Sequence, residues 1–67
     1  MTGIVKRVIP EKGFGFIVGD DKVERFFHAS GLVPPLTIDQ LAAGETRVEF
    51  QAIKSPKGPR AEDICLA

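Results

Sequence analysis

The chain has 67 residues, enough for one small domain and too few for two, because a chain of this length buries only about 60% of its unfolded surface. Its nine Lys and Arg residues balance nine Asp and Glu residues, so the composition alone demands no polyanionic partner. One cysteine and one histidine exclude an internal disulfide and the usual protein zinc site, and no apolar run is long enough for a signal peptide or a membrane span.

The first half of the sequence predicts three short strands. Residues 3–9 are rich in β-branched side chains and end at Pro10, which lacks a backbone N–H and favours a turn. Residues 14–18 form the second strand, and an acidic turn at residues 19–22 separates it from the third, residues 23–29. This short turn predicts that the second and third strands pair as a hairpin.

A long connection, residues 30–45, follows the third strand. It contains two adjacent prolines, and within it residues 37–43 predict one or two turns of helix, with Thr37 as the cap and Gly44 as the terminator. The segment is too short for a helix that would stabilise the fold.

Two strands close the chain. Residues 46–53 alternate, with Val48, Phe50 and Ala52 predicted on the buried face, and a Gly-Pro turn then leads to the last strand, residues 60–66. Strict alternation in that last strand places one set of side chains on one face and a second set on the other: Ala61, Asp63 and Cys65 against Glu62, Ile64 and Leu66.

Five short strands with one long connection predict an all-β fold, a five-stranded antiparallel Greek-key barrel of the OB type that occupies residues 1–67. A closed barrel leaves no sheet edge unprotected, which an open sheet of this size would. Twelve apolar residues are the predicted core: Val5, Val8, Ile17, Val23, Phe27, Leu32, Leu41, Val48, Phe50, Ile53, Ile64 and Leu66.

Two aromatic segments give the clearest functional signal. Residues 12–17 read Lys-Gly-Phe-Gly-Phe-Ile, and Phe26-Phe27-His28 follow in the next strand. Phe14 and Phe16 share one face, and Phe26 shares a face with the polar Glu24 and His28, which favours Phe26 outside and Phe27 inside. If the two strands pair as a hairpin, Phe14 and Phe16 can lie beside Phe26 and His28. Such rings interleaved with Lys and Gly are typical of a base-stacking surface for single-stranded nucleic acid.

Other interpretations of these residues remain open. Phenylalanines in strands are usually core residues, His28 can be a purely structural histidine, and the lysines and arginines can be solvated surface charges. Alternation places Arg25 on the inner face. We therefore expect either that Arg25 lies at the barrel rim with its charged group in water, or that the third strand begins later than residue 23.

Together these motifs resemble the bacterial cold-shock domain over essentially the whole chain. The matching segments, in order, are Gly3-Ile4-Val5-Lys6, Lys12-Gly13-Phe14-Gly15-Phe16-Ile17, Phe26-Phe27-His28-Ala29-Ser30, Leu41-Ala42-Ala43-Gly44 and Lys57-Gly58-Pro59-Arg60-Ala61. The last segment is similar to the family's Gly-Pro-Gln-Ala sequence.

The resemblance implies a protein that binds single-stranded RNA or DNA and acts as an RNA chaperone or a regulator of transcription or translation. Bound strands would stack on the aromatic rings and contact nearby cations, without catalysis. The predicted nucleic-acid-binding residues are Lys6, Arg7, Lys12, Phe14, Phe16, Phe26, His28, Lys57, Pro59 and Arg60.

The sequence departs from the family pattern at three aromatic positions. Arg7 stands where the family usually has an outward Trp, Ala29 where many members have Phe, and Ile38 roughly where the long loop usually offers Phe. Each stack of a base on a ring contributes about 1–3 kcal/mol, so we expect a reduced platform that depends more on charge. A guanidinium at Arg7 compensates in part, because it also stacks on bases.

Three other possibilities compete with this function: an RNA-recognition-motif fold, an enzyme and a protein-interaction module. Residues 12–17 also begin the octamer motif of the RNA-recognition-motif fold, but only eleven residues precede Lys12, too few for the strand, helix and strand that this fold requires. No motif places a nucleophile beside His28, so we expect no enzyme, no cofactor and no small-molecule substrate. A protein-interaction module is the alternative left open. We expect a cytoplasmic monomer without a membrane partner, and a dimer by strand exchange stays open.

Overall fold

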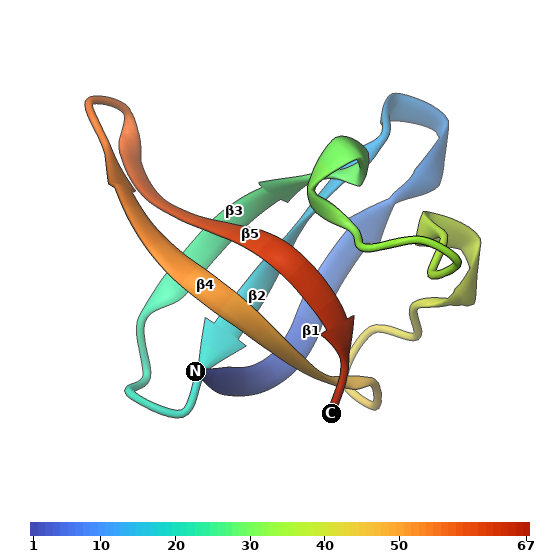
Figure 1. Cartoon of the computed structure of the whole chain (residues 1–67), viewed down its shortest axis with the longest axis horizontal. Coiled ribbons are helices and arrows are strands. Elements are labelled where there is room, and N and C mark those ends of the chain that lie inside the picture. The colour runs from blue at the N-terminus through green and yellow to red at the C-terminus, as the bar shows by residue number, and fades with distance from the viewer.

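Five β-strands make up most of the computed structural model, which describes residues 1–67 (Figure 1). The five predicted strands are confirmed, with small shifts at their ends. The strands are β1 (Thr2–Ile9), β2 (Phe14–Gly19), β3 (Glu24–His28), β4 (Arg47–Ser55) and β5 (Gly58–Leu66). Three single-turn 3-10 helices, η1 (Pro10–Lys12), η2 (Ala29–Gly31) and η3 (Ile38–Gln40), lie in the connections. None of the helices is long and apolar enough to span a membrane.

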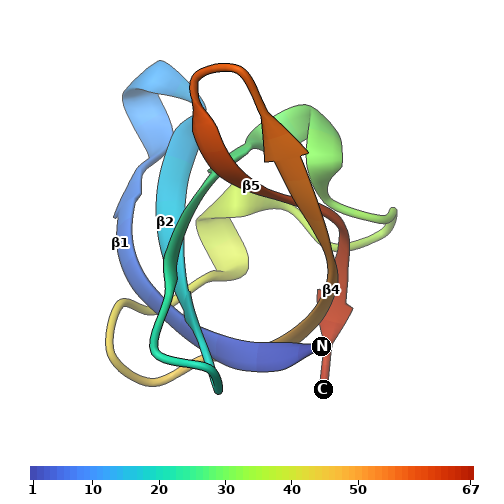
Figure 2. The same cartoon turned by 90° about the vertical axis from the view of Figure 1, so that its left-hand side faces the viewer.

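The strands form a closed barrel in the order β1-β2-β3-β5-β4, with β4 returning to pair with β1 (Figure 2). This order is consistent with the expected OB-type topology. The expectation of a wholly antiparallel sheet is wrong at one pair, because β3 and β5 run parallel where Phe26 faces Arg60. An odd number of strands cannot alternate in direction around a closed ring, so at least one pair must be parallel.

Nine buried hydrophobic residues fill the barrel. Eight of the twelve predicted core residues are among them, and Val8 packs against them while partly exposed. Three predictions are wrong, since the exposed fractions of Val23, Ile53 and Leu66 are 38%, 39% and 60%. The core residues are Val5, Ile17, Phe27, Leu32, Leu41, Val48, Phe50, Ala61 and Ile64.

Irregular pairing between β4 and β5 changes which residues of β5 face the core. The register shifts between Glu49 and Gln51, and Asp63 has a left-handed φ of 51°. The interrupted alternation lets Ala61 and Ile64, three residues apart, both face the core, and it contradicts the strict alternation predicted for this strand.

Beyond this shift, β4 and β5 continue as a two-stranded hairpin that projects from the barrel (Figure 1). Apart from Ala61, which faces the core at the base of the hairpin, the side chains of this projecting part do not lie over the core. Ala52 and Ile53 are therefore both exposed, although Ala52 was predicted to be buried. Val23 is exposed for a different reason, because it lies in the turn before β3 and not in the strand.

The predicted helix in the long connection is only the single turn η3. Thr37 is its N-cap, and the backbone N–H of Thr37 donates to Gln40 Oε1 at 2.8 Å. The helix ends at Leu41 and not at Gly44, because Leu41 turns into the core, where its exposed fraction is 7%. Gly44, with a left-handed φ of 82°, serves the turn that leads to β4.

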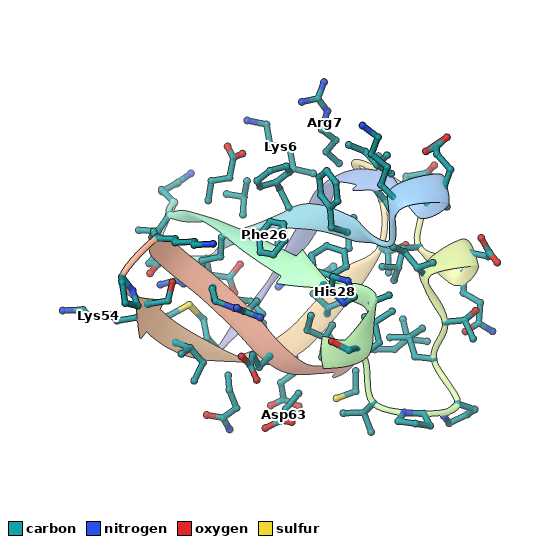
Figure 3. The ribbon with its side chains drawn as sticks, turned by 90° about the horizontal axis from the view of Figure 1, so that it is seen from above. Lys6, Arg7, Phe26, His28, Lys54 and Asp63 are labelled. Carbon is teal, nitrogen blue, oxygen red and sulfur yellow. The ribbon has the colours of Figure 1, made fainter.

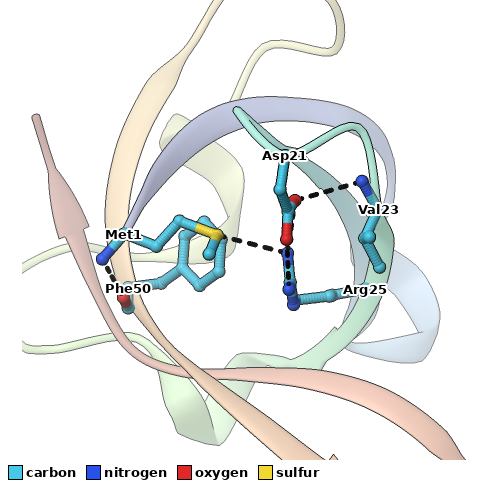
Figure 4. Close-up of polar contacts among 5 residues, drawn as sticks. All are labelled: Met1, Asp21, Val23, Arg25 and Phe50. Atoms are coloured by element: carbon cyan, nitrogen blue, oxygen red, sulfur yellow. Dashed lines mark hydrogen bonds and ion pairs between the residues drawn. The ribbon is translucent and has the colours of Figure 1, made fainter.

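One charged side chain lies inside the barrel. Arg25 is only 8% exposed, and its guanidinium donates two hydrogen bonds to Asp21, at 3.0 and 2.7 Å (Figure 4). The guanidinium carbon also lies 5.6 Å from the centre of the Phe50 ring. The predicted inner position is confirmed, but the expectation that the head group reaches water is wrong, because a carboxylate takes the place of water.

This ion pair changes the acidity of the carboxylate. Hydrogen bonds from the Arg25 side chain and, secondarily, from the Val23 backbone N–H lower the pKa of Asp21 from 3.8 to about 2. Asp21 therefore stays ionised far into the acid range, and the buried guanidinium keeps its counter-charge.

Candidate nucleic-acid interface

Three phenylalanine rings lie together on the outer face of β2 and β3. The ring centres of Phe14 and Phe26 are 5.6 Å apart, those of Phe16 and Phe26 are 5.9 Å apart, and those of Phe14 and Phe16 are 6.2 Å apart. All three rings are partly exposed. We call this group, Phe14, Phe16 and Phe26, the aromatic patch. In Figure 3, Phe26 lies on β3 with His28 farther along the same strand.

Strand pairing creates the patch. Phe16 faces Phe26 directly across the β2–β3 ladder, and Phe14 faces His28. Side chains alternate along each strand, so Gly15, Ile17 and Phe27 take the inner face and are buried. Burial of Phe27 and partial exposure of Phe26 agree with the prediction.

His28 extends the patch and is held in a fixed orientation. Its Nδ1 accepts a hydrogen bond from the Ser30 backbone N–H at 3.1 Å and lies 3.0 Å from Ser30 Oγ. The side chain is otherwise exposed, so one edge and the faces of the imidazole remain available to a ligand. The structure thus brings His28 beside Phe14, as the sequence predicted.

Two cations from β1 lie on the same side of the barrel. The β1–β2 register shifts between Val5 and Arg7, and this bulge leaves both Lys6 and Arg7 exposed although they are consecutive (Figure 3). Arg7 faces Phe16 across the ladder, so it borders the aromatic patch. Lys6 is not a free cation, because its Nζ lies 3.0 Å from Oε1 of Glu24.

The projecting hairpin of β4 and β5 forms the opposite border. Between it and the patch lies a cleft of about 420 Å³. Arg60 stands on the strand beside Phe26, with its guanidinium carbon 5.9 Å from the centre of that ring. The cleft is lined by Phe16, Phe26, Ser55, Lys57, Gly58, Pro59 and Arg60.

The remaining predicted residue, Lys12, lies farther along the β1–β2 connection. It is the last residue of η1 and is exposed, and Gly13 follows it with a left-handed φ of 73°. This turn leads directly into Phe14, so Lys12 is near the start of the patch in the chain. No contact of its side chain with the rings is present.

Three residues near the site were absent from the predicted set. Ser55 and Gly58 line the cleft, and the Ser55 hydroxyl donates to the Gly58 carbonyl oxygen at 2.7 Å, which closes the hairpin turn. The Ser-Pro-Lys-Gly sequence is the signal that indicated this turn. Glu24, the partner of Lys6, was predicted on the same face as Phe26 and His28, but its pairing across strands was not.

The site offers stacking surfaces and cations and lacks the groups of a metal centre. No cluster of three or more His, Cys, Asp or Glu side chains is close enough to hold a metal ion. Partly exposed rings flanked by cations suit flat, anionic ligands.

Comparison with known proteins identifies the family. The family model of the "'Cold-shock' DNA-binding domain" matches residues 1–67. The chain belongs to the cold-shock domain family. Domains of this family bind nucleic acid.

Several relatives of this cold-shock domain carry cold shock-like names. Cold shock-like protein CspI of Escherichia coli is 39% identical over 64 residues, which cover 96% of this chain and 90% of that protein. Cold shock-like protein CspJ of Salmonella typhi is 38% identical with the same coverage. Cold shock-like protein CspLB of Listeria monocytogenes is 37% identical over 65 residues, 94% of this chain and 92% of that protein.

The cold-shock domain has an apolar hollow where the expected rings are missing. Ala29 and Ile38, at the two places where the family resemblance led us to expect Phe, both line a hollow of about 550 Å³. Because small or aliphatic side chains stand there, no ring extends the aromatic patch in this direction. The other lining residues are Ser30, Leu32, Pro34, Pro35, Leu36 and Thr37.

Proposed function

We propose that this cold-shock domain binds single-stranded RNA or DNA, with unpaired bases stacked on the aromatic patch and on His28. One observation carries the proposal: the barrel completes its core without Phe14, Phe16 and Phe26, yet these rings gather on one outer face and remain partly exposed. Scattered exposed apolar residues are ordinary, but a contiguous aromatic group on a surface is typical of a binding site.

Cations on both borders supply the electrostatic part of binding. Lys6, Arg7 and Lys12 come from the β1 side, and Lys57 and Arg60 come from the projecting hairpin. The three lysines and Arg7 would contact phosphates as the strand crosses the patch, Arg60 adds positive charge beside the cleft, and Pro59 is an additional apolar contact. The net charge of zero means that this attraction is local, so affinity should fall as salt rises.

Stacking explains a preference for single strands. A duplex hides the faces of its bases, and a surface that binds unpaired bases shifts the equilibrium toward open structures without ATP or catalysis. We therefore propose that the domain acts as an RNA chaperone or as a regulator of transcription or translation, as a monomer in the cytoplasm. A labelled RNA hairpin tests the chaperone role, since saturating protein should accelerate its opening or lower its melting temperature.

Binding itself is tested by fluorescence anisotropy of a pyrimidine-rich strand. The strand carries the fluorescent label because the protein has no Trp or Tyr. We expect binding to the single strand, weaker binding to the matching duplex, and a large loss in the double variant Phe14→Ala with Phe26→Ala. Two lost stacks at about 1–3 kcal/mol each correspond to a loss of roughly 30-fold or more. Leu66→Ala, an exposed residue away from the patch, is the matched control.

A folded double variant that binds as tightly as the control would contradict the proposal. The apolar hollow at Ala29 and Ile38 favours a second candidate function, a protein-interaction module. That function predicts no binding to either nucleic acid even at low salt, and contact with a protein partner that is insensitive to salt.

A further inference from the structure

We propose that Arg60 makes the cleft beside Phe26 selective for guanine, an inference that rests on the proposed binding of single strands. The cleft volume of about 420 Å³ lies in the range of about 300–1,000 Å³ that small-ligand sites occupy. Its walls combine rings, turn backbone and one guanidinium. This combination suits a single base that stacks on a ring and is recognised by its polar edge.

Arg60 is placed by the fold, and its side chain has an ion pair with Glu62 and a contact with the Phe26 ring but makes no hydrogen bond. Its guanidinium carbon lies 5.9 Å from the Phe26 ring centre, close to the outer limit of a cation–π contact. Its nearest carboxylate, Glu62, lies 3.6 Å away from Nη2 to Oε2, which is too long for a hydrogen bond.

The Nε atom of Arg60 is buried and has no hydrogen-bond partner. A buried donor without an acceptor is unfavourable, so the side chain gains stability by turning toward an acceptor when a ligand supplies one. The Arg60 side chain is 38% exposed and already lines the cleft, so little movement is needed to present its N–H donors to a ligand there.

Guanine has the edge that fits this group. Two parallel N–H donors of a guanidinium match the adjacent O6 and N7 acceptors of guanine, whereas thymine offers one carbonyl acceptor at the equivalent edge, and adenine pairs N7 with a donor. The resemblance to the family's Gly-Pro-Gln-Ala segment places Arg60 at the Gln position. A guanidinium at this place changes the donor pattern, because Gln offers one donor and one acceptor and suits adenine.

At Arg60 itself the adjacent charge favours a base over a phosphate, while Lys57 in the same cleft is available to a phosphate. Glu62 places a carboxylate within 4 Å of the guanidinium, which repels a phosphate and leaves a neutral base unaffected. Phe16 and Phe26 line the same cleft, so a base that enters it also gains stacking. We therefore assign Arg60 to the recognition of a base edge, and Arg7 and Lys12 to the backbone.

The test compares strands of about eight nucleotides, within the site size of an OB fold, by anisotropy. One strand is all thymine, and the others carry a single guanine, adenine or 7-deazaguanine moved through each position. Wild type should bind at least one guanine strand about tenfold more tightly than the all-thymine strand and the matching adenine strand. 7-Deazaguanine, which lacks the N7 acceptor, should lose most of that preference.

Two variants separate base recognition from charge. Arg60→Gln should lower the affinity for the guanine strand to that for the all-thymine strand, so the ratio of the two affinities is the readout. Arg60→Lys keeps the charge and lacks the planar fork, so it should keep the salt dependence and also lose the preference. Far-UV circular dichroism and thermal unfolding establish that both variants are folded.

Three outcomes overturn the inference. Equal weakening of all strands by Arg60→Gln would make Arg60 a phosphate contact. Tight binding of the all-thymine strand by wild type without any guanine preference would remove the inference and leave the proposed function intact. Absence of binding to every strand at low salt would remove both.

Discussion

Gly15, the second glycine of the Lys-Gly-Phe-Gly-Phe-Ile motif, is a position where a small change should damage the scaffold. Gly15 lies on the inner face of β2, directly opposite Phe27. A Cβ atom at this position would overlap the Arg7 carbonyl oxygen of β1 and would lie 2.8 Å from two atoms of the Phe27 ring. Gly15→Ala therefore forces both the β1 backbone and the Phe27 ring to move relative to β2.

The cost follows from how tightly these groups are held. The Phe27 ring is fully buried and would have to shift by about 0.6 Å to restore an ordinary contact of 3.4 Å, in a core with no room to accept it. Overpacking of this kind costs about 1–3 kcal/mol, while Ala in place of Gly returns about 0.4–1 kcal/mol through the unfolded state. We expect a net loss of about 1–2 kcal/mol, which lowers the melting temperature by about 4–16 °C in a domain of this size.

Gly31→Ala is the matched control. A Cβ atom on Gly31 would lie 3.6 Å from the Ala61 carbonyl oxygen and 3.7 Å from Glu62 Cα, both ordinary contacts. The same chemical change should therefore leave stability unchanged or slightly raised. Urea unfolding followed by far-UV circular dichroism measures both variants, and a Gly15→Ala midpoint equal to that of Gly31→Ala would refute the reasoning.

Two further predictions concern charge. Glu24→Gln releases Lys6 from its exposed ion pair, which is worth about 0.2–1 kcal/mol, so it should strengthen single-strand binding by up to about fivefold at low salt and not at high salt. Anisotropy at two salt concentrations measures this, and the absence of a gain at low salt would contradict it. The lowered pKa of Asp21, about 2 in place of 3.8, means that its ionised form stabilises the fold above about pH 4 and that this contribution is lost as pH falls toward 2. Asp21→Asn should lower the urea midpoint at neutral pH, with a difference from wild type that shrinks between pH 4 and 2; a difference that stays constant over that range would show that the Arg25 partner does not act through its charge.

The candidate site could be predicted from the sequence because most of it depends on local rules. Alternation along a strand fixes which neighbours share a face, and the polar Glu24 and His28 were enough to place Phe26 outside and Phe27 inside. The binding roles of these residues stay predictions until they are measured.

The position of the cations needed the tertiary structure. A bulge in β1 exposes Lys6 and Arg7 together, and its place depends on how β1 pairs with β2. The cleft at Arg60 exists because β5 lies beside β3, a pairing between residues far apart in the chain. Neither feature leaves a signal in a short window of sequence.

The sequence by itself determined the number of strands, their approximate limits and the family, because turn residues, β-branched runs and motifs act over a few positions. The tertiary structure alone decided the register of β5, where Asp63 interrupts the alternation and brings both Ala61 and Ile64 into the core. It also decided the fate of Arg25, which Asp21 holds inside the barrel. Both depend on long-range packing in a closed barrel, where the space available at each position is set by strands that are distant in sequence.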